Sequence, residues 1–120
     1  MATGSEFQFV YMTAPNKDSA LEIGRRLVEQ RLAACVNVIE HMTSLYFWQG
    51  AVQRDDEVVL IAKTRDDLMA SLVTEVKALH PYECPCIVAL PIGMGSAEYL
   101  DWVRTETQLR PTPKSPGPGS

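Results

Sequence analysis

The sequence predicts one α+β domain, and three observations support this. The chain has 120 residues, of which 46% are hydrophobic, which is enough for a single core. Apolar runs with strand character and runs with helical spacing follow one another as strand, helix, strand, strand, helix, strand and a last short helix. Prolines and glycines separate these runs. This order is the split β-α-β pattern of a ferredoxin-like sandwich with an extra C-terminal helix.

The first strand and helix are expected over residues 7–13 and from residue 17. "FQFVYMT" is aromatic and β-branched, and it ends at the turn sequence "APN". Asn16 can cap the helix that follows. An apolar stripe at helical spacing is expected to face the sheet: Ala20, Ile23, Gly24, Leu27 and Val28.

A long hairpin is expected next. Residues 34–48 form one strand, Gln49-Gly50 makes the turn, and residues 57–64 return. Fifteen residues at ~3.3 Å each span roughly 50 Å, whereas a domain of ~100 residues is only ~35 Å wide, so the tip must protrude. Strict alternation gives two apolar sides, one with Val36, Val38, Met42, Tyr46 and Trp48, and the other with Cys35, Ile39, Leu45 and Phe47. Another subunit is therefore expected to cover the hairpin.

The second half of the chain is expected to hold a helix, a strand and a helix. Thr64 and Asp67 fit a capping box, and Leu68, Leu72, Val76 and Leu79 repeat along one face until Pro81. "CIVALP", residues 86–91, is expected to be a buried strand. Ser96 can cap the last helix, "SAEYLDWVRTET".

The domain is expected to cover residues 7–109. "GSEF", residues 4–7, fits either a translated cloning junction or a natural acidic start, and residues 1–6 are excluded from the domain in both cases. Residues 110–120 are rich in proline and glycine and are expected to be disordered. The net charge of −4 argues against a nucleic-acid surface, and no apolar run predicts a signal peptide or a membrane span. Three cysteines, an odd number, favour free thiols and a cytoplasmic protein.

Five segments resemble the CutA family of divalent-cation tolerance proteins: "RLAACVNV", "TSLYFWQG", "EVVLIAKT", "HPYE" and "EYLDWV". The resemblance covers residues 7–106 in order and spacing. It implies a homotrimer of ferredoxin-like subunits with ligand clefts between them, a role in copper and divalent-cation homeostasis, and no enzymatic reaction. It also implies a second possibility, a trimeric scaffold or small-ligand signalling protein, which in animals is linked to acetylcholinesterase and hence to a protein partner.

The resemblance implies a copper site at Met12, Leu79 and His80, where Leu79 offers no ligand. Cys84 and Cys86 are two residues apart, so an extended chain points both sulfurs to one side near His80, which suits Cu(I) better than a four-ligand zinc site. The alternative copper ion is Cu(II). Cys35 is a further candidate donor. The alternative is that Cys84, Cys86 and Cys35 only pack as small hydrophobic side chains.

The segment at His80 borders the cleft between subunits in the resembling family. His80 itself is either a helix cap or a ligand contact. Lys63 lies in an apolar strand and needs a partner, for which Glu57 and Glu83 are candidates. The aromatic residues Tyr46, Trp48, Tyr82 and Trp102 are expected in the cleft or in a trimer seam. An acylphosphatase would need a phosphate-binding loop after the first strand, and "MTAPNKDS" offers neither glycine nor arginine.

Overall fold

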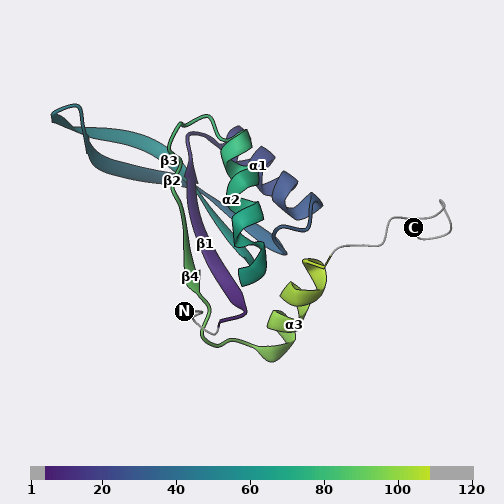
Figure 1. The fold of residues 1–120 in the computed structure, drawn as a ribbon. Helices are drawn as coiled ribbons and strands as arrows, with labels where there is room; N and C mark the ends of the chain where they lie inside the picture. The colour runs from purple at the N-terminus through teal and green to yellow at the C-terminus, as the bar shows by residue number, and fades with distance from the viewer. Residues whose placement is uncertain (1–4, 109–120) are drawn as a thin grey trace, which may run out of the picture.

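The computed structural model describes residues 5–108 of the chain. Its elements are β1 (Phe7–Ala14), α1 (Lys17–Glu29), β2 (Cys35–Trp48), β3 (Ala51–Arg65), the 3-10 helix η1 (Asp66–Leu68), α2 (Met69–Leu79), β4 (Ile87–Pro91) and α3 (Ala97–Glu106). The mixed α+β fold and the order of its elements agree with the sequence prediction (Figure 1). The expectations for residues 1–4 and 110–120 lie outside the described residues, as does the predicted domain end at residue 109.

The four strands form one antiparallel sheet in the order β2-β3-β1-β4. Both α1 and α2 pack on the same face of this sheet, as Figure 1 shows. The core lies between these layers, where Met12, Leu27, Leu60 and Leu72 are buried. Within residues 5–108 no helix is long and apolar enough to cross a membrane.

The β2–β3 hairpin extends beyond the sheet, as expected from its length. Gln49 and Gly50 have φ of 50° and 81°, the left-handed values of a two-residue turn that matches the strand twist. The return strand is longer than predicted, because it begins at Ala51 and pairs with β2 along the polar run before Glu57. The longest dimension of the molecule is 57 Å as a result.

A β-bulge in β2 changes the predicted faces of the hairpin. Ile39 pairs with Val59 and Met42 with Glu57, so β2 has one more residue than β3 between these pairs. The extra residue reverses the alternation. Side chains beyond the bulge therefore exchange faces: Met42, Tyr46 and Trp48 share a face with Cys35 and Ile39, while Leu45 and Phe47 share one with Val36 and Val38. The strict alternation assumed from the sequence was wrong past residue 39.

Two of the three predicted helix starts are confirmed. Asn16 Oδ1 accepts from the Ser19 amide at 2.8 Å, and Ser96 Oγ accepts from the Tyr99 amide at 3.4 Å. The capping box at Thr64 is wrong, since the Thr64 hydroxyl donates to the Leu32 carbonyl at 2.6 Å instead. In α1, the buried stripe ends at Leu27, and Val28 is 40% exposed.

The second face of the sheet is covered by α3 at one end only. There Val103 packs against Phe7 and Ala34. The rest, called the open face below, carries Phe9, Tyr11, Ile39, Ile61, Val88 and Leu90. Val88 and Leu90 are 52% and 57% exposed, and Cys86 precedes β4 and is exposed as well. The expectation of a buried fourth strand is therefore wrong for this chain on its own.

Candidate functional site

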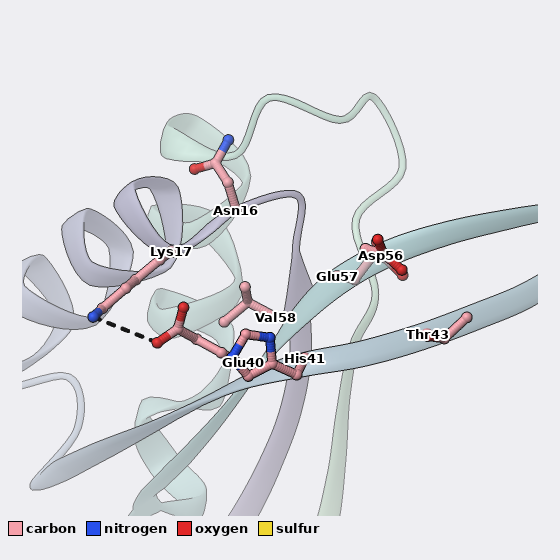
Figure 2. A pocket seen from close by; sticks show the side chains of 8 residues that line it. All are labelled: Asn16, Lys17, Glu40, His41, Thr43, Asp56, Glu57 and Val58. Atoms are coloured by element: carbon pink, nitrogen blue, oxygen red, sulfur yellow. Dashed lines mark ion pairs between the residues drawn. The ribbon is translucent and has the colours of Figure 1, made fainter.

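A polar cleft lies where the hairpin leaves the sheet (Figure 2). It has a volume of about 340 Å³ and is bounded by the start of α1, the bulged part of β2 and the facing part of β3. Its lining residues are Asn16, Lys17, Glu40, His41, Thr43, Asp56, Glu57 and Val58. The cleft thus brings together three segments that are distant in sequence.

The bulge gives the cleft its shape. His41 has φ of 66°, a left-handed value that is uncommon for a residue other than glycine. This conformation places Glu40 and His41 side by side at the strand surface, where both are exposed. Glu40 then reaches Lys17 of α1 at 3.4 Å. The sequence offers no glycine at this position, so the bulge was not predicted.

The cleft is acidic. It has three carboxylates, Glu40, Asp56 and Glu57, against the single ammonium of Lys17. The ion pair between Lys17 and Glu40 is exposed and contributes little to stability. Over residues 5–108 the side chains of Asp56 and His41 make no hydrogen bond or ion pair. The cleft therefore suits a polar or cationic small ligand better than an anion.

Glu57 connects the cleft to the loop after α2. Its carboxylate accepts from Ser44 Oγ at 2.5 Å and from the Tyr82 hydroxyl at 3.0 Å. Burial, and then the bond to Glu57, raise the pKa of Tyr82 to about 12. Burial and the negative charge of Glu57 also raise the pKa of the Cys86 thiol. Glu57 thus holds the loop of residues 80–86 against the base of the hairpin.

His80 is buried and both of its ring nitrogens are engaged. Nδ1 accepts from the Tyr82 amide at 3.1 Å, so Nε2 carries the proton and donates to the Thr13 carbonyl at 2.7 Å. The ring also packs on Tyr82, with centroids 4.8 Å apart. A metal ligand needs a free nitrogen lone pair. His80 can bind a metal only if the bond from Tyr82 is broken. His80 does occupy the C-cap position of α2, where its backbone amide donates to the Val76 carbonyl at 2.8 Å.

The other predicted metal donors lie in different surroundings. Met12 is 1% exposed and belongs to the apolar core. Cys35 is half-buried and donates to Asn37 at 3.9 Å. Cys84 and Cys86 are free and exposed. In the part of the chain that the structure describes, no three His, Cys, Asp or Glu side chains are arranged to hold a metal ion.

The residues predicted for a cleft are only partly brought together. Glu57 and Tyr82 are bonded, and Tyr46 donates to Asp55 on the same hairpin. Lys63 donates to Asn37, and within residues 5–108 of one chain it forms no ion pair with Glu57 or Glu83. The other three predicted residues lie in three different elements. Trp48 is at the hairpin tip, Trp102 packs beside Tyr99 on α3, and Glu83 is exposed in the loop after α2. The sequence reasoning missed Ser44 and the cleft residues around the bulge.

Comparisons with known proteins agree on one family. The family model described as "CutA1 divalent ion tolerance protein" matches residues 8–106. The divalent-cation tolerance protein CutA of Thermus thermophilus is 50% identical over 100 residues, which cover 83% of this chain and 97% of that one. Protein CutA of Homo sapiens is 45% identical over 98 residues, 82% of this chain but only 55% of the human protein.

Solved structures give the same result. The structure of the divalent cation tolerance protein from Thermus thermophilus superposes with a TM-score of 0.83 at 49% identity, covering 85% of this chain and 99% of that one. CutA1 of Oryza sativa superposes with a TM-score of 0.85 at 40% identity, covering 89% and 98%. The similarity therefore extends over the sheet, the hairpin and all three helices.

Proposed function

This chain belongs to the CutA1 divalent ion tolerance family, and from that premise we propose that it is a homotrimer of ferredoxin-like subunits that binds metal ions, with Cu(I) as the preferred ion. The ion is cargo that the protein takes up, and the protein acts by binding and not by catalysis. The exposed pair of thiols at Cys84 and Cys86 is the observation that carries the metal part of the proposal.

The trimer is supported by apolar surface that has no cover within one chain. Ile39, Val88 and Leu90 on the open face are each more than half exposed. On the hairpin, Leu45, Phe47 and Val52 share one face, called the hairpin patch below, and are 69%, 72% and 69% exposed. Apolar surface of this kind on a small domain is typical of a subunit interface. Light scattering should give about three times 13.3 kDa, and a stable monomer would contradict the proposal.

Among residues 5–108, the donors that best fit a soft ion are the two exposed thiols of Cys84 and Cys86. Thiolates are soft ligands, and two of them suffice for linear Cu(I), whereas zinc needs four ligands. Cys84 and Cys86 are both accessible and unbridged. Met12 is enclosed by the core and His80 is engaged at both nitrogens, so these two do not fit the inherited copper site without rearrangement.

A competition titration of reduced protein with a Cu(I) chelator tests the thiol pair. The parent protein is expected to take up one Cu(I) per chain or fewer, and a Cys84→Ser/Cys86→Ser variant is expected to lose this uptake. Cys35→Ser is the matched control and should bind as the parent does. Light scattering must show that both variants keep the mass of the parent.

Unchanged binding in the double variant would remove Cys84 and Cys86 from the proposal. Loss of assembly in that variant would mean that the thiols are packing residues. We also place the protein in the cytoplasm, because free accessible thiols persist in a reducing compartment. Retention of three reduced thiols by protein taken directly from that compartment is the corresponding test.

A second function, a small-ligand sensor or scaffold for which metal is incidental, is favoured by the cleft of Figure 2. Its volume of about 340 Å³ lies within the range of small-molecule sites, and three carboxylates line it. Metal content of protein purified without a tag separates the two functions. Copper retained at a constant ratio supports the first, and metal-free protein that still assembles supports the second.

A further inference from the structure

The contacts of α3 with the rest of the domain are few and mostly polar. Val103 is the buried apolar side chain that this helix contributes, with Leu100 partly buried beside it. The main core takes no residue from α3, whereas α2 contributes Leu72 and Val76 to it. An isolated helix of ten residues is also marginal in water. The attachment of α3 therefore depends on other contacts.

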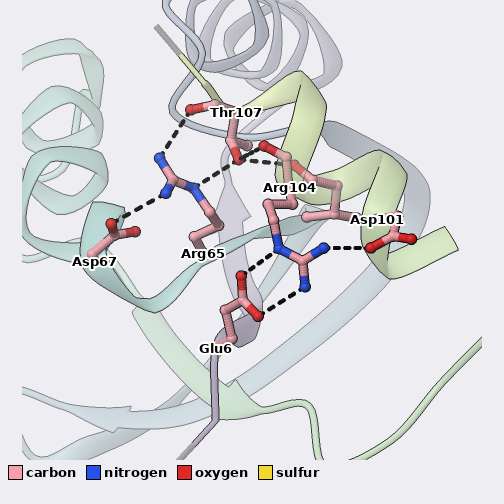
Figure 3. Close-up of polar contacts among 7 residues, drawn as sticks. Glu6, Arg65, Asp67, Asp101, Arg104 and Thr107 are labelled. Atoms are coloured by element: carbon pink, nitrogen blue, oxygen red, sulfur yellow. Dashed lines mark hydrogen bonds and ion pairs between the residues drawn. The ribbon is translucent and has the colours of Figure 1, made fainter. Parts of the chain in front are cut away.

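Three arginines provide those contacts, each joining the α3 region to a different segment. Arg104 of α3 makes a two-pronged pair with Glu6, just before β1, at 2.6 and 2.9 Å (Figure 3). Arg65, at the end of β3, donates to Thr107 through two nitrogens at 3.0 and 3.2 Å. Arg31, after α1, donates to the backbone and side chain of Glu106 at 2.9 and 2.8 Å.

Arg104 is the most exposed of the three arginines, since the side chains of Arg31 and Arg65 are only 15% and 23% exposed. Arg104 and Glu6 are 40% and 49% exposed, and Arg104 also bonds Asp101 and lies over the ring of Phe7 at 5.2 Å. The bond to Arg104 lowers the pKa of the Glu6 carboxyl. Exposed pairs are screened by salt, since the Debye length falls from about 10 Å at 0.1 M to about 3 Å at 1 M. Salt should loosen α3 while leaving the apolar core intact.

We propose that α3 is a clasp that opens as a unit without unfolding of the sheet, and that ionic strength controls how often it opens. Local openings of this kind occur where few apolar contacts are buried. The proposal does not depend on metal binding.

Opening of the clasp has a chemical consequence at Cys35. Tyr99 on α3 lies near the Cys35 thiol, since burial and then the presence of Cys35 raise the pKa of Tyr99, and Tyr99 packs against Trp102. Cys35 lies opposite Lys63 across the strands, and both side chains donate to Asn37. When α3 leaves, Tyr99 no longer covers the half-buried thiol of Cys35, so this thiol becomes more accessible to a reagent. Cys35 is therefore a reporter of the open state.

Native-state hydrogen exchange of the full chain tests the opening directly. Amides of residues 97–106 are expected to exchange at least tenfold faster than those of α2, and 1 M NaCl should accelerate α3 alone. Equal exchange of α3 and α2 at both salt concentrations would overturn the proposal, because α3 would then open only with the whole domain.

Two neutral variants test the anchors. Glu6→Gln removes the charge partner of Arg104, and the control Glu75→Gln removes a carboxylate that pairs with Arg26 at 3.4 Å between α2 and α1 and does not touch α3. At low salt, Glu6→Gln should raise the opening of α3 about three- to tenfold, and 1 M NaCl should erase this difference. Glu75→Gln should leave the exchange of α3 within twofold of the parent. Equal effects of the two variants would overturn the role of the anchors.

Thiol labelling provides the second readout. In a Cys84→Ser/Cys86→Ser background only Cys35 remains, and its reaction with an aromatic disulfide reagent should accelerate in Glu6→Gln by the same factor as the exchange of α3. The mass by light scattering must be the same for all samples. If the labelling rate of Cys35 changes neither with salt nor in Glu6→Gln, α3 does not shield Cys35, and this part of the proposal would be abandoned.

Discussion

Replacing Phe47 in the hairpin patch should weaken the assembled protein and leave the single subunit unchanged. The Phe47 side chain is 72% exposed and has Val52 as its cross-strand neighbour. In an isolated subunit Phe47→Ser removes an exposed side chain, and such changes usually alter the free energy of unfolding by less than about 0.5 kcal/mol. A larger effect must therefore come from contact with another copy.

The magnitude follows from the exposed area. A phenylalanine side chain buries about 200 Å² when fully covered, so the 72% exposed here leaves roughly 140 Å² for an interface. At about 25 cal/mol per Å², covering this area contributes up to about 3.5 kcal/mol per subunit. A trimer contains three copies of Phe47, so the substitution removes this interface free energy three times. The midpoint of assembly should therefore move to a much higher protein concentration.

Light scattering across a dilution series, with thermal melting at each concentration, measures this effect. Phe47→Ser should dissociate at a concentration where the parent does not, and its melting temperature should become concentration-dependent. Met94→Ser is the control, since Met94 is an apolar residue that is 90% exposed and lies in the loop before α3. If Phe47→Ser melts and scatters as the parent does, the hairpin patch is not an interface.

Three smaller effects are expected. Asn16→Ala should lower the free energy of unfolding by about 1 kcal/mol in a denaturant titration, because the cap at the start of α1 is lost, while Asn16→Asp should keep most of it. Leu72→Ala should cost about 3 kcal/mol, because it leaves a cavity between α2 and the sheet. In a spectroscopic titration one tyrosine, absent in Tyr82→Phe, should ionise near 12, and Glu57→Gln should move its pKa toward 10.0. Since the folded pKa is the higher one, the stability that Tyr82 contributes is complete below pH 10.0 and is lost as the pH rises through 12.

The sequence was sufficient to predict helix caps and turns whose interacting residues are close in the chain. The caps at Asn16 and Ser96 each join residues three positions apart, and the turn at Gln49-Gly50 depends on two residues alone. The same kind of rule failed at Thr64. The sequence offered Asp67 three residues ahead as its capping partner, but in the folded chain the Thr64 hydroxyl bonds the carbonyl of Leu32, 32 positions away.

The candidate site depends on contacts of long range, and these were not readable from the sequence. His80 bonds a carbonyl 67 positions away, and Tyr82 bonds Glu57 across 25 positions. The bulge had no local signal either, because His41 adopts a positive φ without glycine. One extra residue then reversed the faces of the hairpin, so the predicted grouping of Tyr46 and Trp48 with Val36 failed.

The metal donors separate into two classes by what they already contact. Met12 and His80 are buried, and the contacts that hold them are part of the fold, so binding a metal there must break packing or hydrogen bonds. Cys84 and Cys86 are exposed, so a metal displaces only water and protons. Burial and the charge of Glu57 raise the pKa of Cys86, and protons therefore compete for this sulfur up to a higher pH than for an ordinary thiol. Because Glu57 also holds Tyr82, one carboxylate links the acidic cleft, the position of the loop and the proton affinity of its thiol.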